Sequence, residues 1–429
     1  MKSTAIDNRT AAVTPPELQA APSSDAQADV FAAPNRSRTA AARCGKPDLL
    51  VFADDWGRHP SSCQHLIKRL RENYRVLWAN SVGTRQVKAN GFTFRRGVEK
   101  LKSWNRGVVQ VDRQMWVVDL PMLPSMGSRT IQHVNRRLVT WRLARIMRQL
   151  QFDPPVVLTN LPYILGLIRR LPRSGLVYYC TDDFSHWPGA DREALQTAEG
   201  ETVAAADRIL AVSDPLLGRF GGAENPKCRY FPHGVDLAQF AAVANTPPTP
   251  AMAKLPGPCI GFFGLIYEKL NFELLAAIAR RFSTGSLALV GPEVFCPVWF
   301  REIPNVHFLG PQPYAELPGW LAGMDVLLMP YVNDEMIRQS DPLKLRECLA
   351  SGKPTVSIDI PEVRRYLPAV RVGGTIEEFV AQVELALAEK DNLPAAQARR
   401  NAVANDGWDR RTSDLAGWLD ELHSSATSK

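Results

Sequence analysis

Lys344 and Glu347 stand three positions apart in SDPLKLRECLASGKP, a short amphipathic stretch with a proline near its start and a glycine near its end. This punctuation predicts a helix that is capped by Ser340 or Asp341 and has Pro342 as its first residue. Free amides at a helix start attract phosphate oxygens, and the Lys344 ammonium group adds positive charge there. Glu347, one turn later on the same face, could accept hydrogen bonds from both hydroxyls of a ribose. The pattern suits a nucleoside diphosphate; the alternative is a surface Lys–Glu pair on an ordinary helix.

Three stretches upstream of this helix end an apolar run at a glycine: GFFGLIYEK at 261–269, LALVGPE at 287–293 and VHFLGPQPY at 306–314. In the first of them, Gly264 would let backbone amides approach a phosphate, and Lys269 could reach the same anion. A single turn of this kind is weak evidence for a nucleotide site. Three strands that end at a glycine on one edge of one sheet, next to the lysine-bearing helix, predict a nucleotide pocket.

These motifs lie within a regular alternation of strand and helix patterns, the helical ones being clearest at 61–73 and 191–206. Such alternation predicts parallel sheets covered by helices, with ligands at the carboxyl ends of the strands. The strands are expected at 48–53, 75–79, 115–119, 155–159, 176–180 and 208–212, and then at 259–263, 286–290, 305–309, 325–330 and 354–358.

A proline-rich stretch without apolar rhythm, NTPPTPAMAKLPGP at 245–258, separates the two series of strands and predicts a linker or hinge. The expected fold class is therefore α/β, with two doubly wound, Rossmann-like parallel-sheet domains facing a cleft.

The composition agrees with a two-domain globular protein. The chain has 429 residues, of which 45% are hydrophobic and 22% charged. Its seven cysteines form no Cys-x-x-Cys pair, which favours a reducing cytoplasm and argues against a thiolate zinc site. No apolar run approaches the length of a membrane span, so any membrane contact is expected to be peripheral. Residues 1–42 lack periodicity and predict a disordered leader without the apolar core of a secretory signal.

Positive charge is concentrated in the first half, where residues 43–235 carry 29 basic and 17 acidic side chains, a net charge of +12. The densest part, Arg129–Arg148, holds six arginines and no acid, together with two apolar stripes at helical spacing. A helix of this kind could bury one face in the protein and lay the other on an anionic membrane surface. The alternative is a core helix with solvated arginines. Nucleic acid is not expected as a partner, because no stacking platform or helix-turn-helix signature accompanies the charge.

Candidate acceptor-side residues follow two strands of the first domain. The loop after strand 48–53 carries Asp55, Trp56, Gly57, Arg58 and His59, and strand 176–180 is followed by Asp182 and Asp183. Trp56 could stack on a sugar face, while Asp55, His59 or Asp182 could accept a hydroxyl proton. The alternative role for each acid is to cap the turn that follows it.

From about Asp48 to Leu422 the chain resembles glycosyltransferases with the two-domain GT-B fold, especially family 4 and related enzymes of bacterial exopolysaccharide and capsule assembly. The resemblance lies in the FFG turn with its lysine, in LVGP, FLG and DPLKLRECLASGKPTV, and in ADRILAVSDPL and FPHGVDLAQF. The ending ARRNAVANDGWDRR followed by TSDLAGWLDEL is similar to the closing helices of the family, which commonly cross back onto the first domain.

The resemblance implies that Lys269 and Lys344 neutralise the diphosphate of a nucleotide sugar and that Glu347 holds the ribose, with the backbone around Gln312 touching the base. Retaining members carry two glutamates separated by seven residues, and the first of these positions is Gln339 here. The arginine usually found after the first glycine is Leu265.

The resemblance also implies a division of the chain. It comprises the leader 1–42, an acceptor-binding domain 43–240, a linker 241–258, a nucleotide-sugar-binding domain 259–405 and a closing helix 406–429.

The expected activity is glycosyl transfer to a glycan or lipid-linked acceptor in exopolysaccharide biosynthesis, with retention of configuration. No metal or other cofactor is expected. The expected location is the cytoplasm, with peripheral binding at the inner face of the plasma membrane. Two alternatives stay open: a nucleotide-sugar 2-epimerase, and a non-catalytic scaffold of a polysaccharide assembly complex.

Overall fold

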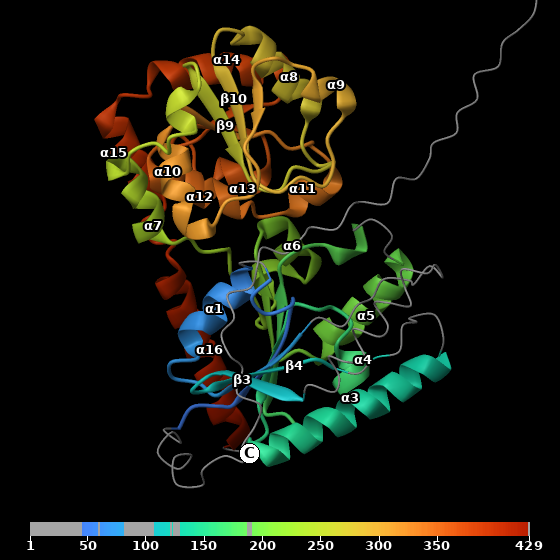
Figure 1. Ribbon diagram of the computed structural model, residues 1–429. Helices are drawn as coiled ribbons and strands as arrows, with labels where there is room; N and C mark the ends of the chain where they lie inside the picture. The colour runs from blue at the N-terminus through green and yellow to red at the C-terminus, as the bar shows by residue number, and fades with distance from the viewer. Residues whose placement is uncertain are drawn as a thin grey trace, which may run out of the picture.

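The computed structural model describes residues 45–58, 61–80, 107–120, 122, 129–186 and 191–427. The leader 1–42 and His59 lie outside the described residues. Two α/β domains are stacked end to end, each built around its own sheet and its own hydrophobic core (Figure 1). None of the helices in the described part of the chain is long and apolar enough to cross a membrane.

The N-terminal domain contains a sheet in the order β3-β4-β2-β1-β5-β6-β7-β8, in which the β3–β4 pair is antiparallel and the other pairs are parallel. Its strands are β1 (Leu49–Phe52), β2 (Val76–Ala79), β3 (Val108–Asp112), β4 (Met115–Val118), β5 (Val156–Thr159), β6 (Gly175–Cys180), β7 (Arg208–Ala211) and β8 (Cys228–Tyr230). Its helices are α1 (Ser62–Leu70), α3 (Arg129–Gln149), α4 (Leu165–Ile168), α5 (Arg192–Ala205) and α6 (Asp214–Arg219).

The C-terminal domain contains a parallel sheet in the order β11-β10-β9-β12-β13-β14. Its strands are β9 (Cys259–Phe263), β10 (Ser286–Val290), β11 (Val306–Phe308), β12 (Val326–Met329), β13 (Thr355–Ile358) and β14 (Arg371–Gly373). Its helices are α7 (Leu237–Ala241), α8 (Phe272–Arg281), α9 (Val298–Arg301), α10 (Leu317–Ala322), α11 (Glu335–Gln339), α12 (Leu343–Ser351), α13 (Pro361–Arg364), α14 (Ile376–Ala388) and α15 (Leu393–Ala402). Strands such as β9 and β10 are apolar runs buried along their whole length, as expected where helices cover both faces of a sheet.

The prediction of two Rossmann-like parallel-sheet domains is confirmed. The antiparallel edge strand β3 was not predicted, and neither were β8 and β14. β3 is exposed for most of its length, while β8 and β14 have three residues each, so none of them carries a usable apolar period.

The chain enters the C-terminal domain earlier than the expected boundary at residue 240. Val235 and Phe240 belong to the C-terminal core. The proline-rich stretch packs on the same domain, because Met252 is buried in that core and the Thr249 amide donates to the Gly319 carbonyl oxygen at 3.0 Å. This stretch is therefore part of the C-terminal domain, and the crossing between domains lies immediately before Val235.

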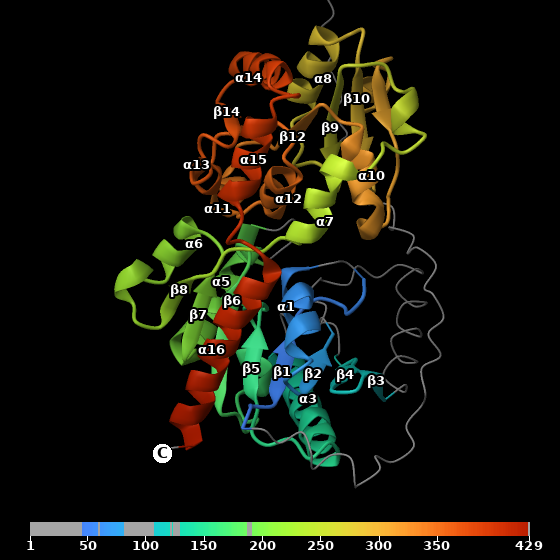
Figure 2. The same cartoon turned by 90° about the vertical axis from the view of Figure 1, so that its left-hand side faces the viewer.

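The closing helix α16 (Trp408–Thr427) returns to the N-terminal domain, as the family resemblance implied (Figure 2). It packs on α1, and the Tyr74 hydroxyl donates to Asp420 at 2.8 Å. The two crossing segments pair with each other. The Val235 amide donates to the Asp406 carbonyl oxygen at 2.9 Å, and the Trp408 amide donates to the Val235 carbonyl oxygen at 3.1 Å. Both connections between the domains therefore run side by side.

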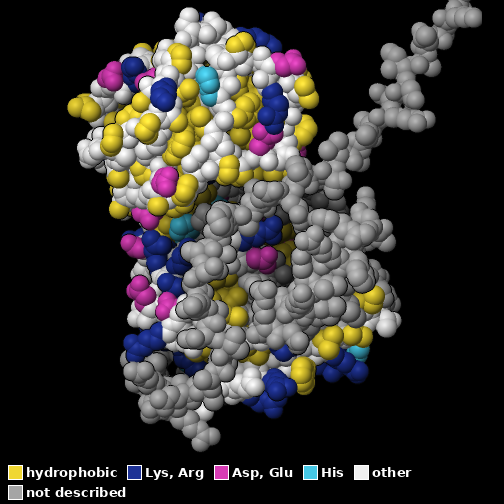
Figure 3. Space-filling model, in the orientation of Figure 1, with side chains coloured by type: hydrophobic (Ala, Val, Ile, Leu, Met, Phe, Trp, Pro, Cys, Tyr) yellow, Lys and Arg dark blue, Asp and Glu magenta, His cyan; other side chains and the backbone are white. Residues whose placement is uncertain are grey.

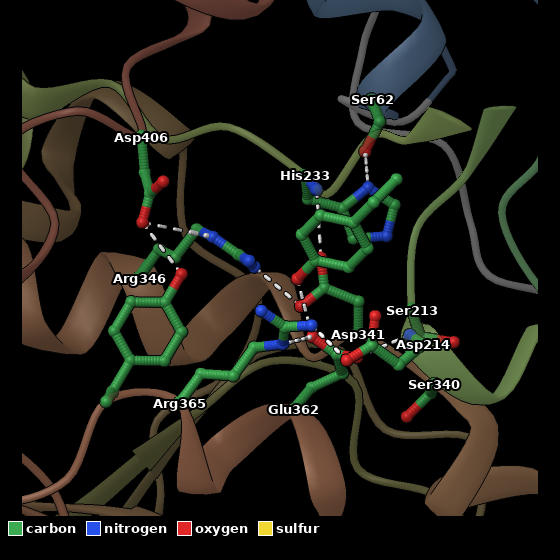
Figure 4. A network of polar contacts seen from close by, with 12 residues as sticks. Ser62, Ser213, Asp214, His233, Ser340, Asp341, Arg346, Glu362, Arg365 and Asp406 are labelled. Atoms are coloured by element: carbon green, nitrogen blue, oxygen red, sulfur yellow. Dashed lines mark hydrogen bonds and ion pairs between the residues drawn. The ribbon is translucent and has the colours of Figure 1, made fainter. Parts of the chain in front are cut away.

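A buried polar network joins the domains next to these crossings (Figure 4). The His233 ring nitrogen Nδ1 lies 2.7 Å from the Ser62 hydroxyl at the start of α1, and the His233 amide donates to Asp341 at 2.9 Å. Asp341 in turn accepts from the fully buried Arg346 guanidinium at 2.6 Å. Asp341 and Arg346 thereby offset each other's charge in this interior, although Nε and Nη2 of Arg346 have no hydrogen-bond partner among the described residues.

A second group of contacts joins α6 to α13. The Asp214 amide donates to the buried Glu362 carboxylate at 2.7 Å, and Arg365 forms ion pairs with both Asp214 and Glu362. The Ser213 hydroxyl donates to the Gln339 carbonyl oxygen at 2.5 Å. These contacts place the carboxyl ends of the strands of the two sheets opposite each other.

The buried His233 ring makes the protein sensitive to acid. Burial lowers the pKa of His233 to about 4, whereas an unfolded histidine titrates near 6.5. Between these pH values the unfolded chain binds a proton that the folded chain does not, so the free energy of unfolding falls as the pH falls. The loss is about 1.4 kcal/mol per pH unit within this window. Between pH 6.5 and 4.5, we expect the free energy of unfolding of His233→Asn to fall by roughly 2 kcal/mol less than that of the parent protein, as measured by urea unfolding.

The matched control is His307→Asn on the edge strand β11, outside this network, which should leave the slope of the parent protein unchanged. An identical slope in His233→Asn and the parent protein would contradict the proposed role of the buried ring.

Candidate active site

Three glycines form the carboxyl edge of the C-terminal sheet. Gly264, Gly291 and Gly310 follow the adjacent strands β9, β10 and β11, with φ angles of 142°, 147° and 70°. The Gly264 amide donates to the Val290 carbonyl oxygen, and the Gly291 amide to the Gly310 carbonyl oxygen, each at 2.8 Å. A Cβ atom on Gly291 would lie 1.8 Å from the Gly264 carbonyl oxygen, so only glycine permits this approach. Backbone rather than side chains therefore lines this edge.

Lys344 lies directly against the first of these turns. Its Cε atom is 2.4 Å from the place where a Cβ on Gly264 would be, and its ammonium nitrogen is 4.7 Å from the centre of the Phe263 ring. The same nitrogen lies 3.4 Å from a carboxylate oxygen of Glu347. The predicted meeting of Gly264, Lys344 and Glu347 is thus present in the structure.

Glu347 is held by a tyrosine that sequence reasoning missed. The Tyr314 hydroxyl donates to Glu347 Oε1 at 3.1 Å, while Lys344 faces Oε2, and the Glu347 side chain is only 1% exposed. Burial and the Glu347 charge both raise the pKa of Tyr314, so its hydroxyl stays protonated as a donor. Tyr314 follows the third of the strands that end at a glycine, and this position in the sequence could have indicated its role.

The start of α12 differs from the prediction. The helix begins at Leu343, with Pro342 at the N-cap position and no side-chain cap. The expectation that Ser340 or Asp341 caps it, with Pro342 inside it, is wrong, because both side chains are engaged elsewhere. The Ser340 hydroxyl donates to the Ile337 carbonyl oxygen, and Asp341 binds Arg346. The ion pair with Arg346 also offsets the charge by which Asp341 would repel an anion.

The other predicted donor-side residues lie on neighbouring segments of the C-terminal domain. The Lys269 ammonium group is 2.6 Å from Asp334, the N-cap residue of α11. Gln312 donates to the Leu309 carbonyl oxygen at 2.8 Å, which fixes the loop that also carries Tyr314. Gln339 is the last residue of α11, where its carbonyl oxygen accepts from the N-terminal domain, as described above. In this structure, Lys269 is therefore paired with Asp334, and Lys344 is paired with Glu347.

The loop after β1 is fixed by hydrogen bonds. The Gly57 amide donates to the Gln64 side chain at 3.1 Å, and Asp55 lies 3.6 Å from the Arg58 guanidinium group. The Trp56 ring packs edge-on against Trp78, with 4.9 Å between the ring centres. Trp56 is thus partly a core residue, a role that the sequence prediction of sugar stacking did not include.

Asp182 and Asp183 have different roles in the structure. Asp183 is buried, and its carboxylate accepts from Ser185 at 2.6 Å and pairs with Arg219 at 2.9 Å. Burial alone would raise the pKa of Asp183, but the Ser185 hydrogen bonds and the Arg219 charge lower it overall. The expectation that Asp183 contacts an acceptor is wrong, because its oxygens hold the interior of the N-terminal domain.

Asp182 lies near the C-terminal domain. Its charge is one of the causes, after burial, that raise the pKa of Tyr267 in the loop between Gly264 and Lys269. Asp55 and Asp182 follow β1 and β6, which are separated by β5, so the ends of these two strands are about 10 Å apart. The two candidate bases therefore follow non-adjacent strands of the sheet.

Several solved structures have a similar fold. Anabaena Alr3699/HepE in complex with UDP and glucose aligns with a TM-score of 0.58 and 15% identity over 87% of this chain and 99% of that one. An E. coli structure described as trehalose-6-phosphate bound with UDP-2-fluoro glucose aligns with a TM-score of 0.62 and 11% identity, again over 87% and 99%. Together with the two facing Rossmann-like domains, these similarities define the GT-B fold.

A family model matches most of the C-terminal domain. Residues 257–389 match the model described as Glycosyl transferases group 1. A curated relative from Bacillus subtilis (strain 168), provisionally named the teichuronic acid biosynthesis glycosyltransferase TuaH, is 28% identical over 228 residues. That match covers 51% of this chain and 57% of the relative. The fold, the family match and this relative all resemble glycosyltransferases with the GT-B fold.

Proposed function

We propose that the protein transfers a sugar from a nucleoside-diphosphate donor to an acceptor hydroxyl. The supporting observation is that Lys344 lies against the glycine turn after β9, with Glu347 one turn further along the same helix. An ammonium group beside uncapped helix amides suits a diphosphate, and a neighbouring carboxylate suits ribose hydroxyls. Because the similar Anabaena and E. coli structures were solved with UDP or a UDP-sugar derivative, uridine donors are the first to test.

In this proposal, contacts with the donor replace contacts that the side chains of the site make with one another. Ribose hydroxyls take the place of Lys344 or Tyr314 at the Glu347 carboxylate. Diphosphate oxygens then accept from the released Lys344 and compete with Asp334 for Lys269. In this proposal, Gln312 borders the base, Gln339 at the end of α11 borders the sugar, and Ser340 lies beside the phosphates.

During transfer, the bond between the sugar C1 atom and the diphosphate oxygen breaks while the acceptor oxygen bonds to C1. The two lysines and the amides of α12 stabilise the charge that develops on the leaving diphosphate, so we propose no metal or other cofactor. With retention of configuration, the leaving phosphate takes the acceptor proton. With inversion, Asp55, His59 or Asp182 would take it, with Trp56, Gly57 and Arg58 nearby on the acceptor side.

We further propose that the acceptor is a lipid-linked glycan of exopolysaccharide biosynthesis, elongated at the cytoplasmic face of the plasma membrane. The support is the name of the Bacillus relative and the basic surface of the N-terminal domain.

A donor screen tests the proposal. The purified full chain is titrated with UDP and GDP by calorimetry and then incubated with radiolabelled UDP- and GDP-sugars, with membrane extract as acceptor. We expect one nucleotide to bind and its sugar to appear in the glycolipid or polymer fraction. Absence of binding by either nucleotide would favour the scaffold role and overturn the proposal. Binding with isomer formation but no transfer would favour the epimerase.

A further inference from the structure

Helix α3 has a buried face and an apolar face turned outward. Val139, Leu143 and Ile146 are buried against the N-terminal domain. On the other side, the side chains of Val134, Leu138 and Trp141 are 37%, 38% and 56% exposed. These three residues follow each other by four and three positions, so they form one stripe along the helix. A contiguous exposed stripe that contains a tryptophan usually marks an interaction surface.

Arginines border this stripe. Arg137, Arg145 and Arg148 are exposed, and no carboxylate among the described residues forms an ion pair with any of them. The Arg145 guanidinium carbon lies 5.7 Å from the centre of the Trp141 ring. The charge of Arg137 is the main cause that lowers the pKa of the exposed His133, followed by burial and Arg136. The face is therefore both apolar and strongly electropositive.

The position of α3 leaves this face accessible. Figures 1 and 2 place the helix at the end of the N-terminal domain opposite the C-terminal domain. Figure 3 shows basic and hydrophobic side chains side by side along the lower right edge of the molecule, where α3 lies in Figure 1. A partner bound here would not obstruct the facing carboxyl edges of the two sheets.

We propose that the exposed face of α3, formed by Val134, Leu138, Trp141, Arg137, Arg145 and Arg148, docks onto an anionic lipid bilayer. Tryptophan favours the boundary between headgroups and acyl chains, and the arginines on either side can reach lipid phosphates while their stems stay near the apolar stripe. A soluble polyanion would satisfy the arginines but would leave the stripe exposed to water. This combination favours a bilayer over an acidic glycan or nucleic acid, and the inference does not depend on the proposed sugar transfer.

Vesicle flotation with the full chain tests this. The protein is mixed with vesicles of pure phosphatidylcholine, or of phosphatidylcholine with 30 mol% phosphatidylglycerol, at two salt concentrations. We expect partitioning only into the anionic vesicles and a decrease at high salt. The triple variant Arg137→Gln/Arg145→Gln/Arg148→Gln should partition roughly 100-fold more weakly, from about fivefold for each charge. Trp141→Ala should reduce partitioning about tenfold.

A charge-matched variant provides the control. Arg192→Gln/Arg280→Gln/Arg410→Gln removes three exposed arginines from other helices and should partition like the parent protein. The same loss in this control would mean that net charge alone drives binding, and would overturn the assignment to α3. Equal partitioning into neutral vesicles would overturn it as well.

Two further results would also contradict the bilayer. If Trp141→Ala keeps full partitioning while binding to a soluble polyanion such as heparin depends on the same arginines, the face binds acidic polymers instead. If light scattering shows a dimer that Trp141→Ala dissociates, the face binds a second copy of the chain. Circular dichroism of each variant confirms that it is folded before its partitioning is compared.

Discussion

Lys344→Met should weaken binding of the nucleotide-sugar donor by roughly 10- to 100-fold, because a hydrogen bond between charged partners contributes about 1.5–3 kcal/mol. The Lys344 ammonium group lies against the Gly264 turn and faces Glu347, so its loss removes positive charge from the proposed diphosphate position. Methionine has a similar length and flexibility and retains the packing against the Phe263 ring. Calorimetric titration with the nucleotide identified by the donor screen measures the change.

A second lysine of the same domain is the matched control. Lys390 is exposed and pairs with Asp325, so Lys390→Met should bind the donor as the parent protein does. Tyr314→Phe provides a further comparison, because it removes the hydroxyl bound to Glu347 without changing charge. We expect it to change donor affinity much less than Lys344→Met. Unchanged affinity in Lys344→Met would exclude this helix start as the diphosphate site.

Arg346→Met should lower the free energy of unfolding by about 3–5 kcal/mol, the usual cost of removing one partner from a buried ion pair. The Arg346 side chain is fully buried, 2.6 Å from Asp341 and 3.6 Å from Asp406. Its removal leaves the buried Asp341 carboxylate with the His233 amide as its one hydrogen-bond donor among the described residues, and weakens the contacts of Asp406 at the second domain crossing. Urea unfolding followed by tryptophan fluorescence measures the effect.

An exposed pair in the same domain serves as the comparison. Arg364 binds Asp359 at 2.6 Å, and its side chain is 64% exposed. Arg364→Met should change the free energy of unfolding far less than Arg346→Met does, because water already solvates this pair. Similar losses in the two variants would mean that burial of Arg346 has no special energetic consequence.

Local sequence patterns were sufficient to predict most of the fold. Runs such as CIGFF and SLALV form the buried strands β9 and β10 within the predicted bounds, because continuous apolar residues fit a sheet covered on both faces. The start of α12 was not predictable in this way. Asp341 looks like a helix cap in sequence, but Arg346 and the His233 amide compete for its oxygens, and this partner set exists only after the two domains meet.

The candidate site was predicted where its residues stand at the end of a strand or the start of a helix. Gly264, Lys344 and Glu347 each stand at a recognisable strand end or helix start, and the structure brings them together. Asp183 stood at an equally recognisable strand end, yet its carboxylate holds Ser185 and Arg219 in the interior. The hydrophobic pattern of the sequence does not tell a side chain that faces the candidate site from one that faces the domain interior. The orientation of a single loop side chain depends on residues far along the chain.

The paired crossings at Val235 and Asp406 restrict how the two domains can move. Two adjacent backbone segments joined by hydrogen bonds leave few soft torsions, so the dominant large-scale displacement is an angular one about a single axis through that pair. Points far from this axis then travel furthest for a given change of angle. The Asp214–Arg365 contact lies close to the crossings, because Tyr366 donates to Asp406, so fluorophores attached to the two domains far from this contact would report donor-dependent rotation with the greatest sensitivity.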